Sequence, residues 1–196
     1  MFKKSLISVL ISSYGVNLSL MLLDYYILDD IKMRMDLASW PSKTEILKQV
    51  VFFMLMEDLC FYWTHRLLHL PSIYPHIHKK HHQHKDPVSI SSEYAHWLEH
   101  ILSNTIPSVA GYKLLGNKVH LITVTMWITM RVTETIDGHS GFEFSWSPYR
   151  LLPFSGSASY HNYHHTHNIG NYGSFFTMWD TLCSTNSSYW THLSRV

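Results

Sequence analysis

The sequence predicts an all-α protein: an integral membrane bundle of about four transmembrane helices, paired as two hairpins, with its histidine-rich segments together on the cytoplasmic face. Charged residues make up only 15% of the 196 residues and aromatic residues 14%, a balance that indicates apolar surroundings. Four apolar stretches of about 18 residues each approach the length that crosses a hydrocarbon layer. Sixteen histidines exceed the 15 lysines and arginines, and half of them fall in three short clusters.

The composition also excludes several classes of protein. A formal net charge of +1 leaves no basic surface for nucleic acid, so no nucleic-acid partner is expected. Cys60 and Cys183 form neither a CxxC motif nor a disulfide framework, which favours reduced surroundings. The length and the absence of internal repeats favour one domain over residues 1–196.

Residues 5–23 form the first apolar stretch, which follows Lys3 and Lys4 and ends before Asp24. Such a stretch, at about 1.5 Å per residue, is long enough to cross a membrane as a helix. A cleaved signal peptide is the alternative, but its apolar region usually spans about 7–15 residues and ends in small residues. Residues 24–48 carry mixed charges and are expected to form a loop with a short interfacial helix.

Residues 46–63 form the second apolar stretch, which Glu57 and Asp58 interrupt near its end. Carboxylates at membrane depth are costly, so both are expected to face the protein interior and to be paired there. Two pairings stay open. The carboxylates contact histidines of the following cluster, or they form a salt bridge to Arg66 or Arg131.

The third and fourth stretches are residues 97–114 and 119–136. Polar residues and Pro107 weaken the third, so a buried kinked helix and a lipid-facing helix are both open. The fourth is apolar up to Arg131 and Glu134, which stand three positions apart and can pair on one helix face.

Two hairpins of helices have a consequence for the histidines. Residues 65–84 and 139–167 emerge on the same side of the membrane, so all three clusters share one face. Lys3 and Lys4 place the N-terminus, and with it this face, on the cytoplasmic side by the positive-inside tendency.

The spacing within the clusters is that of metal ligands on a helix. His65 and His69 stand four positions apart, and two further segments read HxxHH. At about 100° per residue, each set projects from one side of a helix and can converge on a metal or a metal pair. The two HxxHH segments contribute His78, His81 and His82, and His161, His164 and His165.

The number of clustered histidines indicates two metals. A structural zinc needs only four ligands, whereas eight or more histidines supply two metals with about four each. Imidazole suits zinc, copper, iron and nickel, so ligand type alone does not choose the metal. The isolated histidines are expected to be ordinary hydrogen-bonded polar residues: His76, His84, His100, His120, His167 and His192. Of these, His76, His84 and His167 are expected at the surface or an interface.

Acidic residues accompany each cluster. A metal-bound imidazole usually donates its other N–H to a carboxylate, a carbonyl or water, so these acids are candidate partners of the ligands. The acids nearest the clusters in sequence are Glu57 and Asp58, Glu93 and Glu99, and Glu134 and Asp137.

Three segments together resemble the histidine boxes of the fatty acid hydroxylase/sterol desaturase superfamily: residues 57–69, 78–82 and 160–165. Residues 92–96, 134–142 and 169–172 are most similar to its methylsterol monooxygenase branch. The similarity covers about residues 45–185, which leaves 1–44 as an N-terminal span and loop.

The resemblance implies a multi-pass di-iron enzyme of the endoplasmic reticulum membrane. Such enzymes use O₂ and electrons from NAD(P)H, relayed by a carrier of the cytochrome b5 type, and this branch oxidises a 4-methyl group of a sterol precursor. Zinc can replace the two irons in preparations. The implied metal ligands are His65, His69, His78, His81, His82, His139, His161, His164 and His165. Possible further ligands or supporting partners are His96, Glu57, Asp58, Glu93, Glu134 and Asp137.

The sequence departs from the family pattern at two places. Trp97 follows His96 where the family usually has proline, and Cys183-Ser184 replaces an apolar residue and glycine before Thr185. Three alternatives to the methylsterol oxidase therefore stay open: a sterol desaturase or another lipid hydroxylase of the superfamily, a non-catalytic metal-binding membrane paralogue, and a zinc-dependent membrane hydrolase.

Overall fold

The computed structural model describes residues 33–195, together with residues 7, 15 and 18–19. The first predicted span, residues 5–23, and its signal-peptide alternative lie almost wholly outside the described residues. The regular elements of the described part are helices, with two isolated bridges and no strand, which confirms the all-α prediction there. Its helical elements are η3 (Leu37–Ser39), α3 (Lys43–Leu68), η4 (His78–Gln83), η5 (Ser89–Glu93), α4 (Trp97–Glu99), η6 (His100–Thr105), α5 (Ile106–Leu115), η7 (Gly116–Lys118), α6 (Leu121–Gly138), η8 (Pro148–Leu151), α7 (Ala158–His167), α8 (Met178–Leu182) and α9 (Ser187–Leu193).

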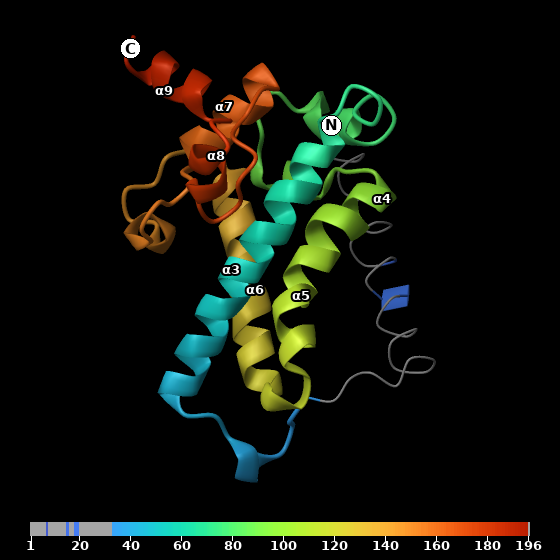
Figure 1. Ribbon diagram of the computed structural model, residues 1–196. Coiled ribbons are helices and arrows are strands. Elements are labelled where there is room, and N and C mark those ends of the chain that lie inside the picture. Colours follow the sequence, from blue (N-terminus) through green and yellow to red (C-terminus); the bar gives the residue numbers. More distant parts are fainter. Residues whose placement is uncertain (1–6, 8–14, 16–17, 20–32, 196) are drawn as a thin grey trace.

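Three long helical segments form the body of the protein, and each begins or bends for a local reason. Helix α3 starts where the Ser42 side chain accepts a hydrogen bond from the Glu45 N–H. The helix that begins at α4 passes through a π-helical turn, η6, and continues as α5, with Pro107 in the first turn of α5. This helical segment packs along α3 (Figure 1), so the third stretch does form a helix, with a π-helical turn ahead of Pro107. Gly111 permits the approach, because a Cβ there would lie 2.7 Å from the Phe53 ring.

The apolar core lies between α3, α5 and α6. Phe53 and Met54 of α3 meet Trp127 of α6, and Phe175 from the C-terminal part stacks on Trp127 with ring centroids 5.8 Å apart. Phe53 and Trp127 are fully buried core residues.

The predicted transmembrane spans are only partly supported. The stretches 46–63, 97–114 and 119–136 do form helices, but no helix among the described residues has the length and the apolar character needed to cross a membrane. The reason lies in the sequence of each helix: buried charges interrupt α3 and α6, and α5 proper has only 10 residues.

The direction of the three helices brings the histidine-rich segments together. Helices α3 and α6 run the same way and α5 runs the opposite way, so the C-terminal ends of α3 and α6 lie beside the start of α4 (Figure 1). The elements η4, α7, α8 and α9 cover this end (Figure 1). The predicted gathering of residues 65–84 and 139–167 at one end is therefore observed.

Candidate metal centre

Nine histidines converge at this end in two adjoining groups. The ligand-type nitrogens within each group lie within 4.8 Å of one another. The rings of His82 and His165, one from each group, stack with centroids 4.7 Å apart, so the groups share a boundary. The first group is His65, His69, His78, His82 and His164, and the second group is His81, His139, His161 and His165. These are the nine ligands that the family resemblance implied.

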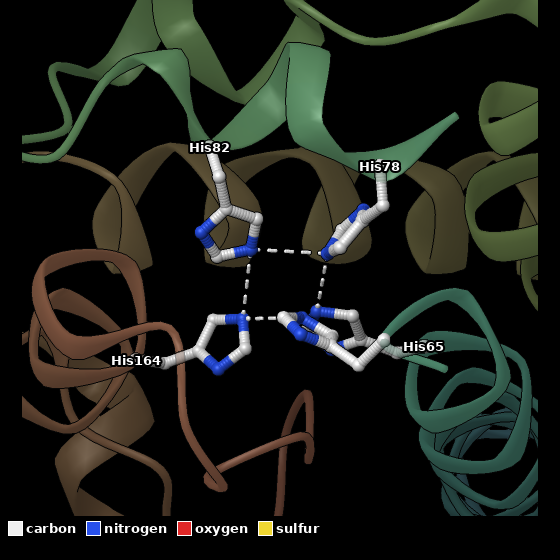
Figure 2. Close-up of side chains that lie close together, drawn as sticks. His65, His78, His82 and His164 are labelled. Carbon is white, nitrogen blue, oxygen red and sulfur yellow. Dashed lines mark hydrogen bonds between the residues drawn. The ribbon is translucent and has the colours of Figure 1, made fainter. Parts of the chain in front are cut away.

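Each histidine reaches its group from a defined place in the fold. His65 lies in the last turn of α3 and His69 ends that helix, while His139 ends α6. Figure 2 shows His78 and His82 of η4, His164 of α7 and His65 of α3 pointing toward one another. Four separate segments of the chain therefore build the first group and its neighbour.

The two HxxHH segments are divided between the groups. In η4 the outer pair, His78 and His82, belongs to the first group and His81 to the second. In α7 the outer pair belongs to the second group and His164 to the first. The spacing of about 100° per residue used for the sequence assumed an α-helix, whereas the segment at 78–82 is a 3₁₀-helix. Its rotation of about 120° per residue spreads the three rings toward different neighbours.

In most of these rings, Nδ1 forms a hydrogen bond to a carbonyl or carboxylate oxygen. His65 Nδ1 lies 2.9 Å from the Tyr172 carbonyl oxygen, and His164 Nδ1 lies 2.6 Å from that of Gly170. Because an oxygen acceptor requires a donor, Nδ1 carries the proton and Nε2 keeps its lone pair. The other such contacts are His139 to Thr135 (3.0 Å), His165 to His84 (3.2 Å) and His78 to the Glu99 carboxylate (2.8 Å).

The unprotonated nitrogens face one another at ligand spacing. His78 Nε2 lies 3.1 Å from His65 Nε2 and 3.0 Å from His82 Nε2, contacts drawn in Figure 2. In the second group, His161 Nε2 lies 3.0 Å from that of His139. A metal with nitrogens at about 2.1 Å has neighbouring ligands about 3.0–3.4 Å apart. Converging lone pairs repel unless a cation lies between them, so this donor set fits two metal ions.

Burial keeps these imidazoles uncharged. Desolvation is the largest influence on each, and it lowers the pKa of His65 and of His139 from 6.5 to about 4. The same cause, with repulsion from neighbouring rings, lowers the pKa of the other seven: His69, His78, His81, His82, His161, His164 and His165. Neutral imidazole is the form that binds metals.

We expect the metal-free protein to lose stability as the pH falls from about 6.5 toward 4. Over this range the unfolded histidines gain protons that the folded ones, with pKa values of about 4 at His65 and His139, do not bind. The free energy of unfolding therefore rises with pH through this window and levels above about pH 7. Melting temperatures of chelator-treated protein from pH 4 to 8 test this, and a flat profile would contradict it.

Glu99 is the carboxylate that contacts a grouped histidine. Its Oε1 accepts from His78 Nδ1 at 2.8 Å, and both side chains are buried. Sequence proximity made Glu99 one of several acids near the clusters. The supporting residues implied by the family resemblance included Glu93 but not Glu99. Glu93 instead lies 3.7 Å from His100 Nδ1. The fold around α4 decides which of these two acids reaches His78, and no sequence spacing shows it.

Glu57 and Asp58 support the fold around the site without touching its histidines. Glu57 Oε1 accepts from Arg131 Nε at 2.5 Å, the salt-bridge alternative, and from Ser174 Oγ at 3.2 Å. Asp58 Oδ1 accepts from the Phe176 N–H at 3.0 Å. Both carboxylates therefore tie α3 to the segment that follows α7.

The remaining candidate residues also lie outside both groups. Glu134 pairs with Arg131 at 3.5 Å, as its spacing predicted. Asp137 accepts from Arg150 and Ser147 at 2.7 and 3.1 Å. His96 caps α4, where its Nδ1 accepts from the Leu98 N–H. Trp97 then occupies the first position of α4, a position that suits proline.

One isolated histidine differs from its expectation. His84, expected at the surface or an interface, is buried because its ring packs edge-on against Tyr94. Its carbonyl oxygen is the acceptor for His165 Nδ1. His84 follows the end of η4, so helical spacing from His78 does not give its position.

The turn after α7 holds two of the grouped histidines through its backbone. The carbonyls of Gly170 and Tyr172 accept from His164 and His65. Gly170 has φ +59°, and a Cβ there would lie 1.9 Å from the Thr185 carbonyl oxygen, so glycine is required. Asp180 fixes the same turn, because its oxygens accept from the N–H groups of Tyr172 and Gly173 at 2.9 and 2.7 Å. Sequence reasoning noted residues 169–172 but missed Asp180, which carries no spacing signal.

Ser184 occupies a backbone conformation that favours glycine, with φ +55°. This explains why serine at this position is a departure from the family pattern. We expect Ser184→Gly to raise the free energy of unfolding by up to about 1 kcal/mol, because it removes the left-handed penalty of about 1–2 kcal/mol against glycine's entropy cost. Thermal unfolding measures this, with Ser188→Gly inside α9 as the matched change that should destabilise.

A pocket adjoins both groups. His65 and His78 of the first group and His139 and His161 of the second line it, together with Phe61 of α3 and Thr135 of α6. A molecule in this pocket lies beside both groups of nitrogens, which is the arrangement needed for a metal-dependent reaction on a bound substrate.

The fold and the site define a helical protein with two adjoining polyhistidine groups that can each hold a metal. Residues 50–185 match the family model described as fatty acid hydroxylase. The chain belongs to this family, which confirms the resemblance seen in its sequence.

Several curated relatives support this assignment. The chain is 39% identical over 177 residues to a very-long-chain aldehyde decarbonylase, GL1-8 of Oryza sativa subsp. indica, covering 89% of this chain and 65% of that protein. It is 38% identical over 189 residues to methylsterol monooxygenase 2-2 of Arabidopsis thaliana, covering 95% and 70%. It is 34% identical over 152 residues to C-4 methylsterol oxidase erg25 of Schizosaccharomyces pombe, covering 76% and 51%.

The extent of these matches varies. The chain spans 65% of the length of the rice decarbonylase and about half of the fission yeast oxidase. No solved structure matches the chain closely enough for comparison.

Proposed function

We propose that this protein is a di-iron, O₂-dependent oxidase that attacks an unactivated C–H bond of a membrane lipid. The best candidate reaction is methyl hydroxylation of a 4-methylsterol in sterol biosynthesis. The observation that carries the proposal is the pair of adjoining groups, in which uncharged Nε2 atoms 3.0–3.4 Å apart border one pocket. Names of relatives such as methylsterol monooxygenase 2-2 support the choice of substrate.

In this proposal the first group holds one iron and the second group holds the other. When bound, the irons supply the oxidising chemistry that no side chain has. The chain's own residues fix the ligands: carbonyls of residues 170–172 hold His164 and His65, and Glu99 holds His78. Rigid orientation of the ligands keeps the metal geometry constant between substrates. Phe61 gives the pocket an apolar side that suits a lipid carbon.

The partners and location follow the family resemblance. We propose a multi-pass protein of the endoplasmic reticulum membrane, with one domain over residues 1–196 and the histidine end facing the cytoplasm. Electrons come from NAD(P)H through a carrier of the cytochrome b5 type. Zinc is a possible substitute for iron in preparations, because imidazole also suits zinc.

Glu99→Gln is expected to weaken metal retention by about 10–100-fold while the fold is kept. Glutamine retains an oxygen acceptor for His78 Nδ1, but it loses the negative charge that strengthens His78 as a donor. Competition with a chelator, read by metal analysis, measures the change. Glu93→Gln is the matched control and should retain metal as the wild type does, since Glu93 faces His100. Equal behaviour of the two variants would contradict the role of Glu99.

A second candidate function comes from the rice relatives. A protein named very-long-chain aldehyde decarbonylase has 39% identity to this chain, against 38% for methylsterol monooxygenase 2-2. Because the two identities are so close, overall similarity does not choose between a sterol and a long-chain aldehyde as substrate.

The deciding experiment combines metal analysis with lipid products. Purified protein should contain about two irons per chain, one for each group. With an electron donor and O₂ it should convert a 4-methylsterol to an oxidised sterol, seen by mass spectrometry. Product from a very-long-chain aldehyde alone would favour the second candidate. Full metal content without any turnover would identify a non-catalytic paralogue, and folded protein without iron or zinc would refute the proposal.

A further inference from the structure

The segment of residues 141–155, which joins α6 to α7, exposes an unusual amount of apolar surface. Four of its side chains are largely exposed: Phe142 (67%), Trp146 (76%), Leu151 (86%) and Phe154 (72%). The segment contains η8 and stands out to one side of the long helices (Figure 1). Exposed apolar groups concentrated in this way mark a surface that contacts a partner or a membrane.

The charges of this segment are neutralised within the protein. It has two charged residues, Glu143 and Arg150. Arg150 Nε lies 2.6 Å from Glu143 Oε1, and Arg150 Nη2 lies 2.7 Å from Asp137 Oδ2. The second oxygen of Glu143 accepts from the Ser159 N–H at 2.8 Å. The segment can therefore enter the boundary layer of a membrane with both of its charges paired.

Hydrogen bonds tie the segment to the helices on either side of it. The Tyr149 hydroxyl donates to the Met130 carbonyl of α6 at 2.9 Å. The Ser147 hydroxyl donates to Asp137, and the Phe154 carbonyl accepts from the Thr177 N–H at 2.7 Å. These contacts hold the segment from beneath while its apolar side chains face outward.

Apolar side chains are also exposed on α6, and the segment reaches the pocket. Val132 and Ile136 of α6 are exposed large hydrophobic residues beside the start of the segment. Both ends of the segment meet the pocket, which is lined by Gly138 and His139 before it and by Gly156 and Ser157 after it. Whatever medium surrounds the segment therefore lies next to the wall of the pocket.

We propose that residues 141–155 insert into the interfacial layer of a phospholipid bilayer. An interface with a protein partner usually contains about one hydrogen bond per 100–200 Å². Most polar groups of this segment instead form hydrogen bonds or ion pairs within the protein. Lipid chains require no hydrogen bonds from the surface that they contact. Exposed aromatic residues above neutralised charges are typical of protein surfaces at the membrane boundary. The insertion also sets the pocket wall against the lipid from which an apolar substrate would come.

The test uses the full-length chain in nanodiscs, with or without bromine on the acyl chains, as a fluorescence quencher. The chain has seven tryptophans, so the emission of Trp146 is taken as the difference between the wild type and Trp146→Phe. That emission should fall by about half in brominated lipid, because interfacial residues lie about 5–10 Å into the boundary. Trp146→Tyr gives the same subtraction if the phenylalanine variant is poorly produced.

Trp190 is the matched control, because it is also exposed (52%) but lies on α9 among polar residues. Its emission, obtained from Trp190→Phe, should change little. Unquenched Trp146 overturns the proposal, whether a second copy or another part of the chain covers the segment. Equal quenching of both tryptophans also overturns it, because it shows lipid contact without selectivity. None of these results depends on iron content or turnover, so failure here is distinct from failure of the proposed function.

Discussion

His164→Ala is expected to abolish product formation, with a fall of about 100-fold or more, and to weaken metal binding in the first group. Second-sphere changes alone typically cost about 10–100-fold, and this change removes a ligand itself. His164 is fully buried, and its Nε2 lies 3.1 Å from that of His82 and 3.2 Å from that of His69. Iron per chain and lipid products, measured on the same preparation, check the result.

His167→Ala is the matched control on the same helix. His167 ends α7 with an exposed side chain stacked on Tyr163, and it lies outside both groups. Its replacement should leave metal content and product unchanged. The wild type must be active for this comparison. If His164→Ala then lowers metal content but turns over substrate as fast as the wild type and His167→Ala do, the first group is not catalytic.

The convergence of the histidines could be predicted from sequence because it rests on local geometry. A spacing of four places two side chains on one helix face, and this holds for His65 with His69 and for His161 with His165. The division of each HxxHH segment between two groups could not be predicted. It depends on the 3₁₀ geometry of η4 and on how η4 and α7 approach each other, which tertiary packing sets.

The contacts that support the ligands were less accessible to sequence reasoning. Nearness in the chain offered both Glu93 and Glu99, and the set implied by the resemblance contained Glu93, but in the structure Glu99 is the one that contacts His78. The acceptors of Gly170 and Tyr172 are backbone atoms, which are the same in every residue and leave no mark in a sequence. The sequence indicated this turn only through Gly170, which the turn requires and which lies in residues 169–172, a segment that resembles the family.

The apolar stretches show a similar limit. Hydropathy located the helices at 46–63 and 119–136, but it could not tell which buried charges meet. Glu57 and Arg131 are 74 residues apart in sequence, and their contact requires α3 and α6 to pack at one particular height. Each charge interrupts its own apolar stretch, and together they neutralise each other inside the fold.

Removing one partner of this pair is expected to have the largest effect on stability. Arg131→Ala leaves Glu57 buried without a counterion, and Glu57→Ala leaves buried Arg131 with only its longer contact to Glu134. Breaking a buried pair in this way costs about 3–5 kcal/mol, with the larger loss expected for Arg131→Ala. Both side chains are nearly inaccessible, with exposed fractions of 0% and 7%. The melting temperature should fall by about 10 °C for a chain of this size. Glu143→Ala, which removes a half-exposed carboxylate from its pair with Arg150, is the control and should cost less than about 1 kcal/mol.

The double variant Glu57→Leu with Arg131→Met separates charge from packing. Apolar residues of similar volume often replace a buried ion pair with little loss, so the double variant should be more stable than either single one. It should still bind metal less well than the wild type. Glu57 also accepts from Ser174, in the segment whose Tyr172 carbonyl orients His65, so leucine at 57 loosens that support. A double variant with recovered stability and full metal retention would show that the pair serves the fold alone, and one less stable than both single variants would contradict the charge argument.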